Sequence, residues 1–349
     1  MKNIITILGA RPQFIKAATL SKALDEHPEA QEILIHTGQH FDSNMSEIFF
    51  NQMSIPEPKY NLAINNLGHG AMTGEMLKAT EKILLDEKPD LVVVYGDTNS
   101  TLAGALAATK LHIPVAHVEA GLRSFNMHMP EEINRILTDR ISSFLFCPTE
   151  AAINNLHNEG FKNFDVIIKN VGDVMFDACR TFALKAKPPQ FSDPFILVTI
   201  HRAENTNDPS KLKAIVEALN ILHQEIKVVI PLHPRTAQYL KKYGLTLKCA
   251  IVEPVGYLEM LGMLQKAKAI VTDSGGLQKE AYFHSKSCVT IRDQTEWVEL
   301  VECGANILSS TNTAEIVQKV RYSLEKTISL NPILYGDGHA VDKIVNLLL

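Results

Sequence analysis

The sequence predicts an α/β protein made of two Rossmann-like, doubly wound domains. Short apolar runs rich in Val and Ile alternate with helical patterns along all 349 residues. Apolar strands separated by helices are typical of parallel sheets that are covered on both faces. A Pro-rich segment at 185–194 interrupts this alternation, and the chain is too long for a typical single core. We therefore expect one domain over 1–185 and a second over 186–335.

The strands are predicted from β-branched apolar runs that are bounded by turn residues. A helix is predicted at 211–223, where Leu212, Ile215 and Leu219 fall on one face. The predicted strands are Ile4–Leu8, Ile33–Thr37, Leu91–Tyr95, Val115–Val118, Phe144–Cys147, Ile196–Ile200, Lys227–Pro231, Ala250–Val252, Ala269–Thr272 and Ser287–Thr290.

Composition excludes several classes of protein. The formal net charge of −5 argues against a nucleic-acid binder, which needs a basic face. No apolar stretch reaches the roughly 20 residues that span a bilayer, and the first apolar run is too short for a signal peptide. The five cysteines form no Cys-x-x-Cys pair, so we expect neither a zinc site nor a disulfide framework. Together these features indicate a cytoplasmic protein.

The most informative segment is Asp273–Glu280, which follows a predicted strand and opens a helix. Ligands of doubly wound sheets bind beyond the carboxyl ends of the strands, and we expect the two domains to face each other across a cleft there. Backbone N–H groups at Ser274, Gly275 and Gly276 would attract phosphate, and glycine allows its close approach. Glu280, one turn further on, could accept hydrogen bonds from ribose hydroxyls. The alternative is an ordinary strand-to-helix turn with a glycine cap.

Charged residues also follow strands of the first domain. Arg11 and Lys16 place two cations after the first strand, where the alternative is a plain helix start. Asp97, Glu119 and Glu131 lie at the same end of the sheet or on its next helix. Each could be only an N-cap or a helix-dipole partner. Together they suit acid–base chemistry, because carboxylates that lie close together push their pKa values apart.

Two further candidates lie in the second domain. His201 follows a strand and could meet a phosphate or protonate a leaving group, although a histidine at a strand end is more often structural. Arg292 follows the strand after the Ser-Gly-Gly helix and could bind an anion, whereas Trp297 could be plain packing.

At this point the motifs, taken in order, resemble the non-hydrolysing UDP-N-acetylglucosamine 2-epimerases. The resemblance implies a fold like that of the GT-B glycosyltransferases, with a C-terminal helix at 336–349 that completes the first domain. The motifs that carry it are Gly9-Ala10-Arg11-Pro12 with Lys16, Thr37-Gly38-Gln39-His40, Gly96-Asp97-Thr98, Val118–Arg123, Pro130-Glu131-Glu132 with Asn134-Arg135, His201-Arg202, and Asp273–Gly276 with Gln278 and Glu280.

The resemblance implies inversion at C2 of a UDP-sugar. A base removes the C2 proton while UDP leaves C1 by anti elimination, and UDP adds back to the glycal after reprotonation on the other face. Catalytic roles carry over to Asp97, Glu119, Glu131, His201 and Lys16. Binding roles for the UDP-sugar carry over to Arg11, His201, Arg202, Ser274, Gly275, Gly276, Glu280 and Arg292.

Departures from the commoner enzymes indicate a branch of the family. Phe41 and Asp42 follow His40, Ala203 follows Arg202, and Trp297 follows Thr295-Glu296. The segment Gly9–Lys16 together with Thr295-Glu296-Trp297 resembles the epimerases that act on UDP-2,3-diacetamido-2,3-dideoxyglucuronic acid for O-antigen or related surface polysaccharides. The uronate carboxylate calls for an additional cation, for which Arg123, Arg135 and Arg292 are candidates.

Several alternatives remain at this stage. The substrate could be UDP-N-acetylglucosamine itself, or the chain could be a hydrolysing epimerase, a GT-B glycosyltransferase or a nucleotide-sugar sensor. We expect no metal, because no group of His, Asp and Glu residues has the spacing of metal ligands. We expect no nicotinamide cofactor, because the motif Gly-x-Gly-x-x-Gly is absent after the first strand. The expected partners are the UDP-sugar and a second copy of the chain in a homodimer, with neither nucleic acid nor membrane.

Overall fold

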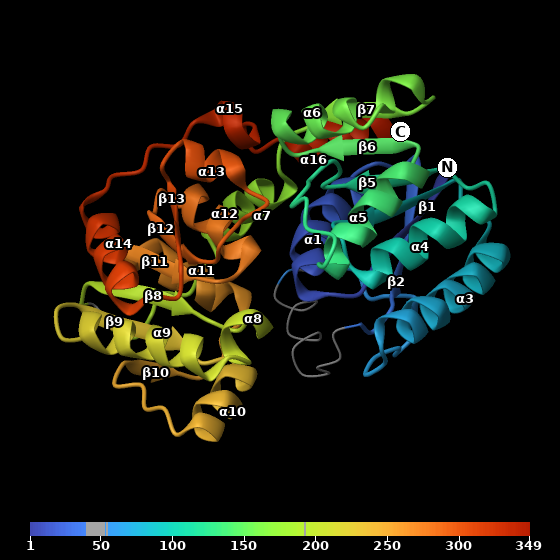
Figure 1. Cartoon of the computed structure of the whole chain (residues 1–349). Coiled ribbons are helices and arrows are strands. Elements are labelled where there is room, and N and C mark those ends of the chain that lie inside the picture. The colour runs from blue at the N-terminus through green and yellow to red at the C-terminus, as the bar shows by residue number, and fades with distance from the viewer. Residues whose placement is uncertain (40–52, 54, 192) are drawn as a thin grey trace. The chain divides into compact units, whose positions relative to one another are not determined.

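The computed structural model describes residues 1–39, 53, 55–191 and 193–349, and these form two compact units (Figure 1). Unit 1 comprises residues 1–181 and 331–349, and unit 2 comprises residues 182–330. The sequence placed these boundaries at 185/186 and 335/336. His40, Phe41 and Asp42, where the sequence departs from the commoner enzymes, lie outside the described residues.

The described part of unit 1 contains a seven-stranded parallel sheet in the order β3-β2-β1-β4-β5-β6-β7. Its strands are β1 (Lys2–Leu8), β2 (Ala30–His36), β3 (Tyr60–Asn61), β4 (Leu91–Tyr95), β5 (Val115–Val118), β6 (Phe144–Cys147) and β7 (Ile167–Asn170). Its helices are α1 (Arg11–Asp25), α3 (His69–Glu87), α4 (Asn99–Lys110), α5 (Pro130–Ile141), α6 (Glu150–Asn158), the 3₁₀ turn η1 (Phe161–Asn163), α7 (Val174–Ala183, which crosses into unit 2), α15 (Pro332–Tyr335) and α16 (Ala340–Leu348).

The described part of unit 2 contains a six-stranded parallel sheet in the order β10-β9-β8-β11-β12-β13. Its strands are β8 (Phe195–Thr199), β9 (Lys227–Pro231), β10 (Ala250–Val252), β11 (Ala269–Thr272), β12 (Cys288–Ile291) and β13 (Asn306–Ser309). Its helices are α8 (Ala203–Thr206), α9 (Pro209–Leu222), α10 (Pro234–Tyr243), α11 (Tyr257–Lys266), α12 (Gly275–Phe283), α13 (Val298–Glu302) and α14 (Thr313–Glu325).

The predicted fold class is confirmed, and all ten predicted strands are present. The sequence analysis missed β3, β7 and β13, which lie at sheet edges. Of the four residues of β7, three are exposed, whereas all five residues of β4 are buried. An edge strand needs no continuous apolar run, so it can escape the pattern that predicts buried strands; these three do, whereas the edge strand β10 was predicted.

Both sheets reverse their winding direction at one point. From β1 the chain crosses to β2 on one side, and from β4 it crosses to β5 on the other, so the helices α1 and α4 cover opposite faces. The same reversal occurs between β8 and β11 in unit 2. In such sheets ligands bind beyond the strand ends at this switch point. The loops after β1, β4, β8 and β11 are therefore the natural places for a site.

Apolar side chains on both faces of each sheet form the cores. Ile5, Ile7, Val92 and Val94 are completely buried in unit 1, and burial of each such side chain stabilises the fold by about 1.5–3 kcal/mol. The corresponding cluster of unit 2 packs β8, β9, β11 and β12 against α9 and α14. Among the described residues, no helix combines the length and apolarity needed to cross a membrane.

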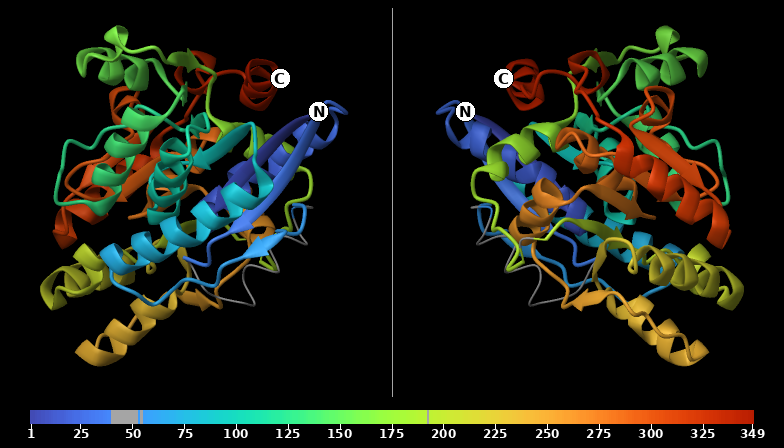
Figure 2. Two further views of the ribbon diagram at one scale, coloured as in Figure 1. Left: turned by 90° about the vertical axis from the view of Figure 1, so that its right-hand side faces the viewer. Right: turned by 90° about the vertical axis from the view of Figure 1, so that its left-hand side faces the viewer.

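The helix α16 returns to unit 1, where it packs against α1. The two ends of the chain lie close together (Figure 2), and Lys2 Nζ donates a hydrogen bond to the Leu348 carbonyl at 2.6 Å. The side chain of Asp177 on α7 caps this helix, because its Oδ2 accepts from Val341 N at 2.8 Å. Burial raises the pKa of the Asp177 carboxyl from its ordinary 3.8 to about 6.

This raised pKa predicts that Asp177 destabilises the folded protein, by an amount that depends on pH. Between pH 3.8 and 6 the unfolded chain ionises while the folded chain keeps the proton, so stability falls as pH rises through this window. Above pH 6 the full cost, about 3 kcal/mol, is present. We expect Asp177→Asn, which keeps the acceptor oxygen, to stabilise the protein in urea unfolding more at pH 8 than at pH 5. The exposed Asp165→Asn is the control, and a gain that is equal at both pH values would contradict the assignment.

Candidate functional site

The end of β1 and the end of β4 are joined by the side chain of Gln13. Its Oε1 accepts from Gly9 N at 2.7 Å and from Ala10 N at 3.0 Å. Its Nε2 donates to the Tyr95 carbonyl at 2.7 Å and to Thr101 Oγ1 at 2.9 Å. This buried amide therefore holds together the two loops of the switch point in unit 1.

Lys16 and Glu119 form an ion pair above Gly96. Lys16 Nζ lies 2.6 Å from Glu119 Oε1, and both side chains are 8% exposed. A Cβ added to Gly96 would lie 3.6 Å from Glu119 Oε1 and 3.8 Å from Lys16 Nζ. Gly96 and Glu119 both have positive φ angles, of 61° and 72° respectively. A left-handed conformation at a glutamate is strained, and strain of this kind clusters at functional sites.

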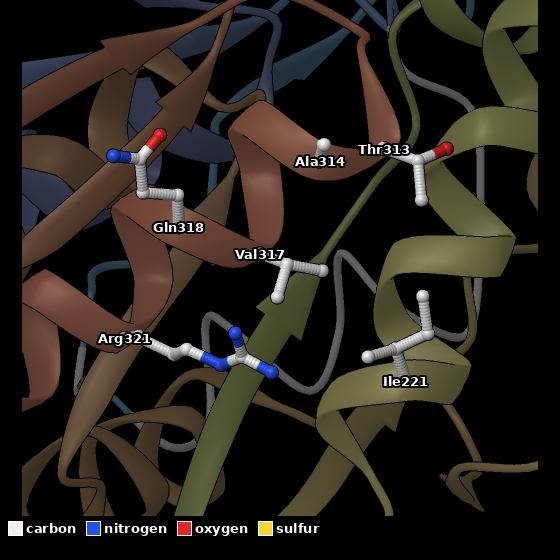
Figure 3. A pocket seen from close by; sticks show the side chains of 6 residues that line it. All are labelled: Ile221, Thr313, Ala314, Val317, Gln318 and Arg321. Carbon is white, nitrogen blue, oxygen red and sulfur yellow. The ribbon is translucent and has the colours of Figure 1, made fainter.

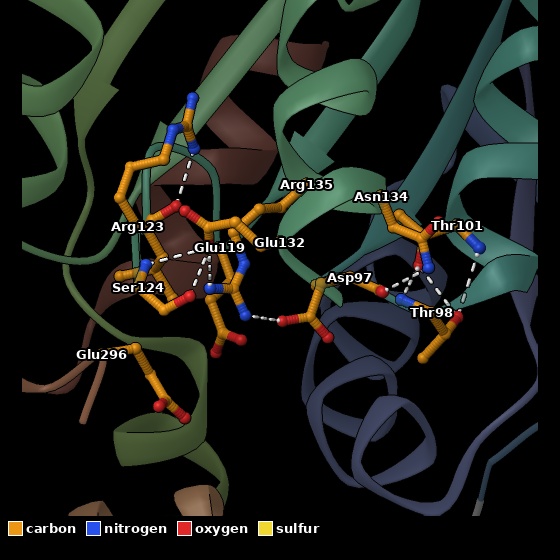
Figure 4. Close-up of polar contacts among 12 residues, drawn as sticks. Asp97, Thr98, Thr101, Glu119, Arg123, Ser124, Glu132, Asn134, Arg135 and Glu296 are labelled. Atoms are coloured by element: carbon orange, nitrogen blue, oxygen red, sulfur yellow. Dashed lines mark hydrogen bonds and ion pairs between the residues drawn. The ribbon is translucent and has the colours of Figure 1, made fainter. Parts of the chain in front are cut away.

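Asp97 pairs with Arg135 beside this ion pair, and Figure 4 shows Asp97, Glu119 and Arg135 at the same edge of unit 1. Arg135 also donates from Nη1 to Glu132 Oε2 at 2.7 Å. The Asp97 side chain remains 27% exposed, and Asn134 Nδ2 holds the Asp97 carbonyl at 2.9 Å. The structure thus brings together three predicted site residues, Lys16, Asp97 and Glu119.

The two glutamates at the start of α5 have opposite environments. Glu131 is exposed, whereas Glu132 is completely buried. Glu132 accepts from the backbone N–H groups of Ser124 at 2.9 Å and Phe125 at 2.8 Å, and so holds the loop before the helix. Arg11 opens α1, and its side chain lies outside what the structure describes.

Asp273 organises the corresponding loops of unit 2. This completely buried carboxylate accepts from His201 N at 3.0 Å, Arg202 N at 2.9 Å and Asn205 Nδ2 at 3.1 Å. It lies between β11 and the helix that begins with Gly275, so it joins the ends of β8 and β11. Asp273 therefore joins the two loops at the switch point of unit 2, as Gln13 does in unit 1.

The predicted phosphate cradle opens α12. Ser274 is the N-cap residue, and Gly275 and Gly276 are the first two helical positions. A Cβ at Gly275 would lie 2.4 Å from Glu296 Oε1, whereas one at Gly276 would meet open space. Backbone N–H groups at a helix start attract anions, and the open space at Gly276 would admit one.

Arg292 and Arg202 lie beside this cradle. Arg292 is 6% exposed and donates from Nη1 to Glu296 Oε2 at 3.0 Å. Arg202 Nη2 lies 3.9 Å from the Cβ position of Gly275. His201 stacks on His233 with 5.3 Å between ring centroids, and Glu280 is 6% exposed on the same helix. The predicted unit 2 residues therefore gather around the ends of β8, β11 and β12.

A separate groove of about 480 Å³ lies between α9 and α14 (Figure 3). None of its lining residues is a predicted site residue; they are Ile221, Thr313, Ala314, Val317, Gln318 and Arg321. Within the described part of the chain, no group of three or more His, Cys, Asp or Glu side chains could hold a metal ion.

Sequence reasoning missed the buried polar residues behind the site, chiefly Gln13, His117, Asp139, Glu132 and Asp273. A signal existed for His117, since a histidine interrupts the apolar strand Val115–Val118. Glu132 and Asp273 lie inside quoted motifs, and Gln13 lies between Pro12 and Lys16 of another, but the roles of all three depend on loops distant in sequence.

Comparison with known proteins places the chain in one group. The family described as UDP-N-acetylglucosamine 2-epimerase matches residues 22–349. The chain is 58% identical to UDP-2,3-diacetamido-2,3-dideoxy-D-glucuronate 2-epimerase of Pseudomonas aeruginosa, with 99% of each chain covered. It is 46% identical to a UDP-N-acetylglucosamine 2-epimerase of Methanocaldococcus jannaschii, covering 98% of this chain and 97% of that protein. A crystal structure of the M. jannaschii UDP-GlcNAc 2-epimerase in complex with UDP-GlcNAc and UDP matches with a TM-score of 0.92 at 44% identity, covering 100% and 99% of the two chains.

Proposed function

Because this chain belongs to the UDP-N-acetylglucosamine 2-epimerase family, we propose that it epimerises UDP-2,3-diacetamido-2,3-dideoxyglucuronic acid at C2, from the gluco to the manno isomer. The observation that carries the choice of substrate is the 58% identity over 99% of both chains to the P. aeruginosa enzyme of that name. The reaction class, an isomerase acting on a UDP-sugar, is common to the family. The proposed role is the supply of a surface-polysaccharide precursor in the cytoplasm.

The proposed mechanism assigns deprotonation and reprotonation at C2 to Asp97, Glu119 and Glu131. The C2 proton goes to a carboxylate as the C1–O bond to UDP breaks, which leaves a glycal. Lys16, whose Nζ lies 2.6 Å from Glu119 Oε1, would stabilise the charge that develops near the sugar. A second carboxylate would return a proton to the opposite face of C2, and UDP would then add back to C1.

The proposed binding site for the leaving UDP is the start of α12. The N–H groups at Ser274, Gly275 and Gly276 would hold the diphosphate, and Glu280 would hold the ribose. Expulsion of a diphosphate needs donors and cations around the oxygens on which charge develops. Arg11, His201, Arg202 and Arg292 would supply these.

The uronate carboxylate needs a cation of its own, and the ion pairs of the three candidate arginines support one of them over the others. Arg123 donates to Asp139, Glu159 and the Leu122 carbonyl. These bonds engage Nε and both terminal nitrogens of Arg123, and Arg135 likewise donates from both terminal nitrogens, to Glu132 and Asp97, so Arg292 is the proposed partner of the substrate carboxylate.

Proton NMR in D₂O tests the proposal. The protein is incubated separately with UDP-2,3-diacetamidoglucuronate and with UDP-N-acetylglucosamine. We expect deuterium at C2 and a manno isomer only with the uronate. Turnover of UDP-N-acetylglucosamine alone would keep the reaction and change the substrate. Free sugar with UDP would indicate a hydrolysing epimerase, and no exchange in either tube would favour a glycosyltransferase or a sensor.

Carboxylate variants complete this experiment. We expect Asp97→Asn and Glu119→Gln each to slow exchange by about 10²–10⁴-fold, the usual contribution of a positioned acid or base. Glu131→Gln tests the third proposed carboxylate by itself. Its side chain, unlike that of Glu119, is exposed. If Glu131→Gln keeps full exchange, Glu131 loses its catalytic role; if all three variants do so, the acid–base proposal fails.

Gly276→Ala tests the phosphate cradle. A Cβ there meets open space, so stability should hold or rise by up to about 1 kcal/mol, the helix preference for Ala over Gly. The same Cβ would occupy the path of a phosphate, so we expect UDP affinity in calorimetry to fall by about tenfold or more. Gly74→Ala is the matched control, since Gly74 is a helical glycine of unit 1 that also faces open space. Equal UDP affinity in both variants would place the diphosphate elsewhere.

We further propose that the enzyme is a homodimer. Helix α5 supports this, because apolar side chains lie on its exposed face and charged side chains on its buried face. Ile133 and Leu137, one turn apart, are 40% and 46% exposed, while Glu132 and Asp139 are completely buried. A helix that shows apolar side chains outward is expected where another surface covers it. Light scattering after size exclusion should give twice the chain mass, and Leu137→Glu should shift it toward the monomer. A monomeric wild-type protein would refute the dimer.

A further inference from the structure

His117 lies at the centre of a buried polar cluster that the proposed mechanism does not use. Its side chain is completely buried on β5, two residues before Glu119. Nδ1 lies 2.7 Å from Asp139 Oδ1, and Nε2 lies 2.7 Å from the Gly96 carbonyl. A carboxylate and a carbonyl oxygen are both acceptors, so both ring nitrogens must donate. Only the imidazolium form has two donors.

The charges around His117 support this form. Burial alone would raise the pKa of Asp139, but hydrogen bonds and charges from His117 and Arg123 hold that pKa below its ordinary value. Arg123 Nη1 lies 2.7 Å from Asp139 Oδ2, and Arg123 Nε lies 2.7 Å from Glu159 Oε1. Apart from His117, the cluster contains two anions, Asp139 and Glu159, and one cation, Arg123, so an imidazolium balances its charge.

The cluster contacts both loops that carry the proposed catalytic carboxylates. The Gly96 carbonyl that His117 binds belongs to the residue before Asp97. Asp139 Oδ2 accepts from Gly121 N at 3.1 Å, two residues after Glu119. No residue with a Cβ fits at Gly121 without strain, because its φ is 80° and an added Cβ would lie 2.5 Å from the Ala152 carbonyl. One imidazolium therefore links the two loops through its two nitrogens.

We propose that His117 is a positioning residue: its imidazolium, oriented by Asp139, donates from Nε2 to the Gly96 carbonyl and so sets the separation of Asp97 from Glu119 for proton transfer at C2. This inference rests on the proposed epimerase function. His117 does not touch the substrate, and it acts through Gly96. Reacting groups displaced by about 1 Å can lose about 10²-fold in rate, which is the size of effect such a bridge can control.

Two substitutions separate the halves of the bridge. The amide nitrogen of His117→Asn takes the place of Nδ1 and keeps the bond to Asp139, but it loses Gly96. The amide nitrogen of His117→Gln takes the place of Nε2 and keeps Gly96, but it loses Asp139. We expect His117→Asn to lower kcat for C2 deuterium exchange by about 10²-fold with little change in KM or UDP affinity. His117→Gln should retain most of kcat and instead lose thermal stability, because Asp139 then lacks one partner.

If His117 had only a structural role, its main contribution would be to neutralise the charge of Asp139. His117→Gln, which loses Asp139, would then have a lower kcat than His117→Asn. Equal kcat in the two variants, or a lower kcat in His117→Gln, would overturn the proposal. A parallel fall in UDP affinity would do so as well.

Nitrogen-15 NMR of the imidazoles in the wild-type protein tests the same inference without any variant or substrate. Both nitrogens of His117 should be protonated at neutral pH, and a neutral ring would refute the bridge even if the enzyme is active. If the ring is doubly protonated but the wild-type protein exchanges no deuterium with either sugar, the proposed function fails while the bridge stands; its role in catalysis then falls with that function.

Discussion

The candidate chemistry depends on the reversal of winding direction in each parallel sheet. Right-handed crossovers leave β1 and β4 in opposite directions, as they do β8 and β11, so the crossover helices among the described residues diverge from the strand ends between them. Lys16, Asp97 and Glu119 follow strands at or beside the first reversal, and Arg202 and Ser274 lie at the second. The site residues are thus grouped by topology before any side chain contributes.

Buried polar side chains then give these loops their shape. Gln13 satisfies two backbone N–H groups after β1 and the carbonyl at the end of β4, and Asp273 satisfies two N–H groups after β8. Loops that follow buried strands contain backbone N–H and C=O groups that water cannot reach. Each such group left unpaired costs about 1–3 kcal/mol. Rigid strand ends and these internal partners together hold the exposed donors of the site in place.

Charge is arranged differently in the two units. In unit 1, carboxylates pair with cations, with Glu119 beside Lys16 and Asp97 beside Arg135. In unit 2, a buried anion, Asp273, lies behind a helix start that is itself electropositive.

The sequence by itself determined the fold class, the buried strands and the family. Buried parallel strands are continuous apolar runs, and the motifs lie at the ends of those strands, so both are local features. Only the tertiary structure decided which acidic residue is buried, because Glu131 and Glu132 are neighbours on one helix and differ only in the face they occupy. It also decided that His117 joins Asp139 to Gly96, since these contacts connect residues 22 and 21 positions apart. The edge strands β3, β7 and β13 depended on it as well, because pairing with a neighbour, rather than their own composition, makes them strands.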